Sequence, residues 1–376
     1  MNKIARFLLI LTMVFSACST EDDGGENPDG ETGENSFDRG EMLANWADNI
    51  IAPAFENFDS STQSLEDKTS AFVQDPDEAK LADVRSAFET AYLDFQSVSM
   101  FEIGKAEQLG YRNFLNTYPT NAAKIQQKIE AGSYNLELPS SYAEQGFPAM
   151  DFLINGLGST DLEIVSFYTE NANAANYGSY LEDASKRINS LTAEVSGSWQ
   201  GDYRDTFVNN TSSSSTGAVD KFTNDYVMYF EKFLRLGKIG FPAGAFTGEP
   251  SPQNTEAFYS NNFSKALYLK ALESVQDFFN GNHFDGNGSG KSYRQYLDYL
   301  DSMKDEADLS GLINSQFDAI ESQATSLDAS LKNQVETNNT IMLEAFDLLQ
   351  RNVVLLKVDM LQALSISVDY VDSDGD

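Results

Sequence analysis

GFPAMDFLINGLG, residues 146–158, is the stretch that best indicates how this chain folds. Proline is favoured at the first helical position, where its missing N–H would be unpaired anyway, so we expect a helix to begin at Pro148. Glycine commonly closes a helix, which puts the end near Gly156. Asp151 and Asn155 would lie one turn apart on a single polar stripe of an otherwise apolar helix. Such a helix is normally buried, so the stripe must face water, a polar partner or a cleft, and we favour a cleft.

Helical periodicity extends from this stretch in both directions. Apolar residues recur at spacings of three and four near the start of the folded part: Met42, Trp46, Ile50, Ile51, Phe55 and Phe58. Further helices are expected at about 76–104, 119–132, 161–195, 217–238, 253–280, 290–306, 310–335 and 338–365. No run of alternating apolar residues is long enough to predict a sheet. The fold class we predict is therefore all-α.

The helices are expected to form two packed bundles. Residues 196–216 are rich in Gly, Ser and Thr and have little to bury, so they mark a seam. A chain of 376 residues also exceeds the size at which single cores stop growing. We predict an N-terminal bundle over residues 39–200 that carries the GFPAMD motif, and a C-terminal bundle over residues 201–376. The helix at 338–365 has apolar residues on too many sides for one face, so it should be mostly buried.

The N-terminus reads as a lipoprotein signal. Lys3 and Arg6 precede an apolar run that is too short to span a bilayer, and small residues follow before Cys18. We predict a signal peptide over residues 1–17 and lipidation of Cys18, with a plain signal peptide and an incidental cysteine as the alternative. Residues 18–38 are acidic with scattered Gly and Pro, which predicts a flexible tether. Acids directly after the cysteine resemble surface-export tags of some Gram-negative lipoproteins, so we favour an outer-membrane lipoprotein displayed outward over one that faces the periplasm.

The charge excludes some partners. The net charge is −33, from 58 acids against 25 bases, and such a field repels nucleic acid and anionic lipid while it concentrates cations. With one cysteine, the chain has no intramolecular disulfide and no thiolate metal cage. We interpret the excess of acidic residues as a solvated exterior, and the alternative interpretation is a surface that collects metal ions.

The motif resembles the G-x-H-x-x-E signature of the imelysin-like proteins, also called peptidase family M75. Gly146 matches the Gly, Pro148 stands in the place of His, and Asp151 stands in the place of Glu. The stretches at 230–242 and 256–260, and the chain end at 356–376, look like later blocks of the same family. The resemblance covers roughly residues 40–376. It implies a fold of two helical bundles and an association with iron acquisition.

The candidate site follows from these blocks. Polar residues among apolar ones are rarely buried without partners, so they form either ion pairs between the bundles or a binding cleft. The candidates are the motif residues together with the polar residues of these blocks: Gly146, Phe147, Pro148, Asp151, Asn155, Glu102, Arg112, Arg235, Lys238 and Ser260. Asp151 and Glu102 are the candidate metal ligands, and we expect Asp151 to be ionised and aimed, with Asn155, at the space between the bundles.

Catalytic metal chemistry has little support in the sequence. A zinc hydrolase needs several ligands, whereas His283 is the chain's one histidine and lies in a polar stretch. Residues 285–290 partly fit a calcium loop, but Tyr296 stands where the bidentate Glu belongs, so a helix-capping loop is the better interpretation. The acidic residues 372–376 read as a solvated tail. No motif of a serine hydrolase or a phosphate loop is present in the sequence.

Two functions remain. The first is a non-catalytic surface lipoprotein that works in the uptake of iron or another nutrient, with a cleft near Asp151. It would be anchored by its lipid, would bind a small ligand or a weakly held iron or calcium ion, and would act with an uptake receptor or another surface protein. The second is a metallopeptidase of the M75 type. Because Pro148 offers no donor atom, we favour the first.

Overall fold

The first long helical segment buries its apolar stripe as the sequence predicts. In the computed structural model, which describes residues 37–370, this segment runs without a break from residue 39 to residue 74. Its stripe is fully buried: Met42, Trp46, Ile50, Ile51, Phe55 and Phe58. Trp46 packs against Phe222 and Phe278, which joins the start of the folded chain to its second half. The predictions for residues 1–36, Cys18 included, and for the tail at 371–376 fall outside the described residues.

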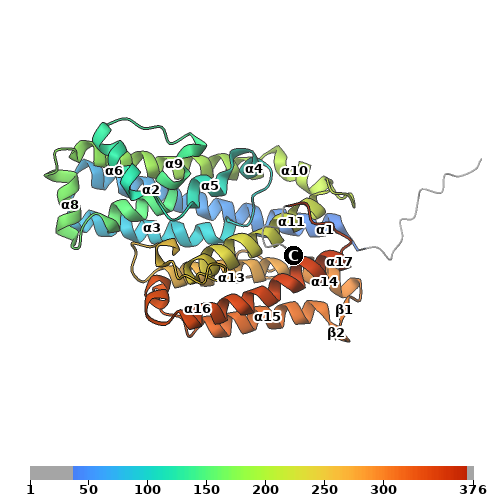
Figure 1. Ribbon diagram of the computed structural model, residues 1–376. Helices are drawn as coiled ribbons and strands as arrows, with labels where there is room; N and C mark the ends of the chain where they lie inside the picture. Colours follow the sequence, from blue (N-terminus) through green and yellow to red (C-terminus); the bar gives the residue numbers. More distant parts are fainter. Residues whose placement is uncertain (1–36, 371–376) are drawn as a thin grey trace, which may run out of the picture. The chain divides into compact units, whose positions relative to one another are not determined.

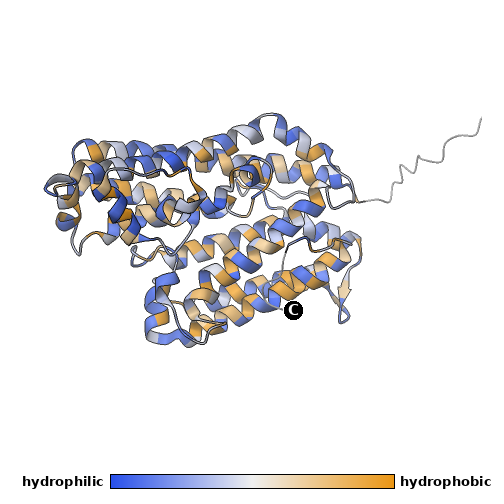
Figure 2. Cartoon of the chain, turned by 45° about the horizontal axis from the view of Figure 1, so that its top comes forward, coloured by the Kyte–Doolittle hydropathy of each residue, from blue (hydrophilic) through white to orange (hydrophobic). Residues whose placement is uncertain are grey.

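Helices with short connections make up the first half. In chain order they are α1 (Arg39–Asn45), the π-helix η1 (Trp46–Ile51), α2 (Ala52–Gln74), α3 (Glu78–Val98), α4 (Lys105–Leu109), α5 (Tyr111–Asn116), α6 (Ala122–Ala131), the 3-10 helix η2 (Pro139–Glu144), α7 (Gly146–Asp151), the π-helix η3 (Phe152–Gly156), α8 (Asp161–Thr169), α9 (Ala174–Gln200) and α10 (Asp202–Asn209). The long helix α2 packs along both α3 and α9 (Figure 1). Hydrophilic and hydrophobic residues are interleaved along these helices (Figure 2), as in amphipathic helices that bury one face.

The second half adds a further set of helices and one small hairpin. Its elements are α11 (Ala218–Met228), the π-helix η4 (Tyr229–Gly240), α12 (Phe241–Ala243), the 3-10 helix η5 (Pro252–Asn254), α13 (Ser264–Asn280), α14 (Tyr293–Tyr299), β1 (Met303–Lys304), β2 (Ala307–Asp308), α15 (Leu309–Ala324), α16 (Leu331–Val354), the π-helix η6 (Leu355–Met360) and α17 (Leu361–Ala363). The two strands pair antiparallel. The α-helix α16 packs on η4 and α15, while α13 packs on α3 of the first half.

The all-α fold class is confirmed, since only four described residues lie in named strands. The buried apolar side chains of both halves form one hydrophobic cluster, and residues 37–370 lie in one compact unit. The boundary between two bundles at residue 200 stays a prediction. Within the described residues, no helix has the length and apolar character needed to cross a bilayer.

The predicted helix at 161–195 is two helices. The first, α8, ends at Thr169, and α9 begins at Ala174. Between them the backbone N–H of Asn173 donates to the side chain of Asn171 at 2.8 Å. Asparagine competes with helical hydrogen bonding in this way and favours turns, which explains the break.

The predicted seam at 196–216 is shorter than expected. Helix α9 continues to Gln200, and α10 then extends to Asn209. Gly197 lies inside α9, where glycine costs about 1 kcal/mol relative to alanine. The buried side chains of Val195 and Trp199 on the same helix outweigh that cost.

Several other helix ends differ from the prediction. The helix predicted to start at Pro76 begins at Glu78, because Asp77 caps it by accepting from the Lys80 backbone N–H, and it ends at Val98 rather than near Gly104. The helix predicted from Pro119 begins at Ala122, after the capping residue Asn121.

In the second half, α13 starts only at Ser264, and the helix predicted at 310–335 ends at Ala324. Helix α16 starts at Leu331, after the cap Ser330, but its backbone leaves helical geometry at Asn338 (φ −154°, ψ 79°), where the last helix was predicted to start.

The predicted helix at 290–306 ends at Tyr299, and Asp301 then has φ +50°, which helical backbone does not allow. Asp305 and Glu306, also with positive φ, form the turn of the β1–β2 hairpin.

The last long helix is amphipathic rather than mostly buried, so that prediction is wrong. Leu349, Leu356 and Met360 are fully buried, but Val354 is 39 % exposed and Val358 is 54 % exposed. Helix α16 and η6 therefore pack on the rest of the chain along one face.

Candidate functional site

The motif helix is fixed by its first residue. Helix α7 begins at Gly146, two residues before the predicted start at Pro148. Gly146 has φ +71°, and a Cβ at this position would lie 2.2 Å from the backbone O of Leu115. Only glycine meets both conditions, so it lets the motif helix approach the end of α5. All six residues of α7 are buried, and the ring of Phe147 stacks on that of Tyr92 with 4.4 Å between centroids.

Asp151 accepts three hydrogen bonds at the end of α7. The Tyr259 backbone N–H donates to Oδ2 at 2.8 Å, while the Ser260 hydroxyl donates to Oδ1 at 2.5 Å and the Asn155 amide donates to Oδ1 at 3.0 Å. The same Asn155 amide also lies 2.9 Å from Ser260 Oγ. The structure thus brings together three residues that the sequence nominated. The polar stripe of the motif faces a polar partner, the loop at 259–260.

The environment of Asp151 raises its proton affinity. The residue is 1 % exposed, and burial raises the pKa of its carboxyl group to about 6, although the hydrogen bonds from Ser260, Tyr259 and Asn155 oppose this shift. Within the described chain, no basic side chain forms an ion pair with this carboxylate. The charge is therefore stabilised by neutral donors alone.

A small pocket lies beside Asp151. It has a volume of about 80 Å³. Half of its lining residues are aromatic or proline and four are polar; the lining residues are Tyr118, Pro119, Thr120, Pro148, Asp151, Gln253, Thr255, Ala257, Phe258 and Tyr259. Ala257 has φ +53°, an uncommon backbone conformation for a residue with a Cβ. Thr255 is 1 % exposed, and its hydroxyl has no hydrogen-bond partner among the described residues.

A second polar cluster lies behind this loop. Lys238 on η4 forms a buried ion pair with Glu256, and its ammonium group also donates to Gln96 Oε1 at 2.8 Å. Glu256 further accepts from the Asn116 amide at 2.6 Å. Burial lowers the pKa of Lys238, and the charge of Glu256 opposes that shift. Lys238 is thus a partner in a structural ion pair, one of the two roles that the sequence left open.

The remaining candidates lie in other clusters. Glu102 accepts from the backbone N–H of Arg112 at 3.0 Å, and the Arg112 guanidinium lies over the ring of Phe233 at 4.2 Å from its centroid. Burial raises the pKa of Glu102. Arg235 contacts Gln350 and the buried Glu231, and Lys357 also pairs with Glu231. None of these hydrogen bonds or ion pairs reaches Asp151.

The residues at the motif do not fit a metal centre. The ring of Pro148 has no ligand atom, and Glu102 accepts from the backbone N–H of Arg112 in a separate cluster. Across residues 37–370, no three His, Cys, Asp or Glu side chains come together as a metal site would need. In the loop that resembles a calcium site, the carboxylate of Asp285 accepts from the Asn287 backbone N–H at 2.9 Å, as in an ordinary turn.

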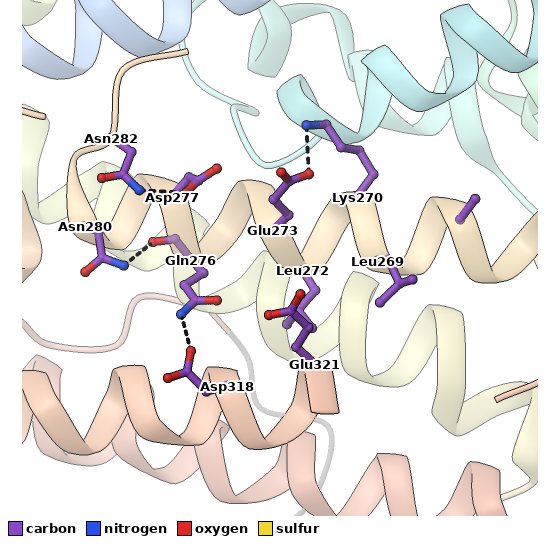
Figure 3. A pocket seen from close by; sticks show the side chains of 11 residues that line it. Leu269, Lys270, Leu272, Glu273, Gln276, Asp277, Asn280, Asn282, Asp318 and Glu321 are labelled. Atoms are coloured by element: carbon purple, nitrogen blue, oxygen red, sulfur yellow. Dashed lines mark hydrogen bonds and ion pairs between the residues drawn. The ribbon is translucent and has the colours of Figure 1, made fainter. Parts of the chain in front are cut away.

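Two larger hollows were not foreseen from the sequence. One is a groove of about 610 Å³ between α13 and α15, with Glu273, Asp277, Asp318 and Glu321 along its walls. Figure 3 shows Gln276 of α13 reaching Asp318 of α15 across it. The other, of about 530 Å³, adjoins the Asp151 cluster through Asn155, Tyr259 and Ser260. Sequence reasoning also missed Thr255 and Glu256, although the family-like block at 256–260 pointed to that loop.

Comparison with known proteins agrees with this architecture. The crystal structure of an imelysin-like protein from Psychrobacter arcticum has a TM-score of 0.69 and 16 % identity, and the match covers 88 % of this chain and 97 % of that one. The structure of a "putative iron-regulated protein A precursor" from Parabacteroides distasonis has a TM-score of 0.69 and 17 % identity, with the same coverage. These likenesses show the shared fold. A search of curated proteins gives no significant match.

The family itself is shown by the sequence. The imelysin family model, Peptidase M75, matches residues 51–350. That range contains α7, the Asp151 cluster and the loop that carries Thr255 and Glu256. This chain belongs to the imelysin family.

Proposed function

We propose that this imelysin-family protein is a non-catalytic binding protein and that it holds its ligand at the pocket beside Asp151. The observation that carries this proposal is the hydrogen-bonded group of Asp151, Asn155 and Ser260, which lies at the family motif and next to a pocket. Pro148 stands where the family signature has His, and its ring can neither bind a metal nor transfer a proton. The side chains at the motif therefore support the binding of a ligand better than metal-dependent hydrolysis of a peptide.

The biological role we propose is uptake of iron or another nutrient at the cell surface. The imelysin resemblance implies an association with iron acquisition, and one structural relative is named as an iron-regulated protein precursor. The predicted lipid at Cys18 would anchor the protein in the outer membrane, and the acidic residues after it favour outward display. The partner would then be an uptake receptor or another protein of the same surface.

The test is the location and role of the protein in its own cells. Cys18→Ala should move the protein from the membrane fraction to the soluble fraction, because a lipid chain supplies the anchor. A strain that lacks the gene should grow more slowly than the wild type when iron is limiting, and the wild-type gene should restore growth. Equal growth under iron limitation, together with an unmodified N-terminus by mass spectrometry, would refute the surface uptake role.

Metal analysis separates this proposal from the peptidase alternative. Protein purified without chelator should hold less than stoichiometric transition metal, because the motif provides no set of converging ligands. One tightly bound zinc or iron per chain, lost on Asp151→Asn, would favour the metallopeptidase instead.

A further inference from the structure

The charge of Asp151 lacks a counterion within residues 37–370. Buried charges are normally paired, and here three neutral donors take the place of a cation. A carboxylate offers about four acceptor positions. Oδ1 accepts two hydrogen bonds and Oδ2 accepts one, and the Ser260 backbone N–H also lies against the carboxylate, so Oδ2 is the less engaged of the two oxygens in these three hydrogen bonds. The ammonium group of Lys332 lies over the ring of Phe258, a residue of the pocket wall, 4.1 Å from its centroid, and forms no ion pair with Asp151.

Thr255 provides a second unsatisfied group in the same pocket. Its Oγ1 is buried and has no hydrogen-bond partner in the part of the chain that the structure describes. Leaving a buried hydroxyl unpaired is unfavourable, and each such group calls for an explanation, such as a bound molecule. Because Thr255 and Asp151 line one pocket, a single ligand with several N–H donors can satisfy both.

Size and wall chemistry narrow the ligand class. A cavity needs about 10–15 Å³ of this kind of volume to hold one water, so a pocket of about 80 Å³ accepts a small group of a few heavy atoms. The rings of Tyr118, Phe258 and Tyr259 favour a cation over an anion. Pro119 and Gln253 are exposed at the rim, which leaves an opening for the rest of a longer molecule.

We propose that this pocket binds the protonated amino group of a primary amine, with Asp151 and Thr255 as its hydrogen-bond partners and the aromatic rings around its first carbons. The ammonium group has three N–H donors. One donates to Asp151 Oδ2 and one donates to Thr255 Oγ1. This inference rests on the proposed function, because it names the ligand class of the same site.

The probe is ethylammonium chloride, with binding to the mature protein measured by calorimetry. Ethylammonium has three non-hydrogen atoms. At the largest binding free energy per atom known for small ligands, about 1.5 kcal/mol, they correspond to a dissociation constant of about 1 mM. Tetramethylammonium has no N–H group to donate, and acetate has the wrong charge, so neither should bind. Calcium chloride and iron(II) chloride serve as the metal probes.

Thr255→Val is the informative variant, because it keeps the shape of the side chain and removes only the hydroxyl. It should raise the Tm of the free protein, since no hydrogen bond is lost, and it should weaken ethylammonium binding about tenfold. Thr69→Val is the matched control, because Thr69 Oγ1 is also buried and without a partner among the described residues but does not line the pocket. The control should raise Tm and leave ethylammonium binding unchanged. Asp151→Asn should abolish binding.

Two results would overturn the amine proposal. One is the absence of ethylammonium binding to the wild type, and the other is equal affinity in the wild type and Thr255→Val. If acetate or a metal probe binds instead and Asp151→Asn removes that binding, the site stands and only the ligand class is wrong. Amine binding without a growth defect under iron limitation would instead reject the uptake role and leave the amine site in place.

Discussion

At the scale of single residues, Gly146 is the position where the motif tolerates least change. Gly146→Ala would put a Cβ 2.2 Å from the Leu115 carbonyl oxygen, at a φ of +71°. Positive φ costs about 1–2 kcal/mol for a residue with a Cβ, and overpacking adds about 1–3 kcal/mol. The expected loss is therefore about 2–5 kcal/mol in the free energy of unfolding, measured by urea denaturation. Gly197→Ala is the control, since a Cβ there meets nothing within 4 Å, and it should be neutral or stabilising.

The sequence nominated Asp151, Asn155 and Ser260, and the structure joins them in one hydrogen-bonded group. They could be found because each lies in a block that resembles the family. Thr255 could not be found in the same way, because a threonine shows its unpaired hydroxyl only after the loop has packed around it. The ion pair proposed as one alternative for Asp151 is not formed within residues 37–370, where its partners are neutral donors.

At the scale of secondary-structure elements, the pair Lys238–Glu256 ties η4 to the loop before α13 and, through Gln96, to α3. Lys238→Met would leave Glu256 buried without a cation, which typically costs about 3–5 kcal/mol. The double variant Lys238→Met with Glu256→Gln removes both charges and should recover at least half of that loss. Urea unfolding of the two variants measures the difference. If the double variant is as unstable as the single one, the pair acts through packing rather than charge.

The helices were predictable where apolar residues recur at regular spacing. In the segment from Met42 to Phe58, for example, every residue of the predicted apolar stripe is buried. Element ends were less predictable, because caps and turns decide them: Asp77 caps α3, and Asn171 with Asn173 separates α8 from α9. The π-helices were not predictable. In η4 the wider turn positions Glu231, Arg235 and Lys238, but spacings of three and four do not distinguish it from an α-helix.

At the scale of the whole molecule, a net charge of −33 predicts self-repulsion in the folded state. Added salt shortens the Debye length from about 30 Å at 0.01 M to about 8 Å at 0.15 M, so it screens this repulsion. We expect the Tm of the mature protein to rise by about 2–4 °C between these concentrations of sodium chloride, which corresponds to roughly 1 kcal/mol.

The buried pair provides an internal control for this salt effect. Lys238 is 3 % exposed and Glu256 is 2 % exposed, so bulk salt should screen their interaction much less than it screens surface charges. Lys238→Met should thus show the same rise of Tm with salt as the wild type, with a constant difference between the two. A Tm that falls with salt would mean that surface ion pairs such as Arg204–Asp48 outweigh the repulsion. A difference that shrinks with salt would mean that solvent reaches the Lys238–Glu256 pair.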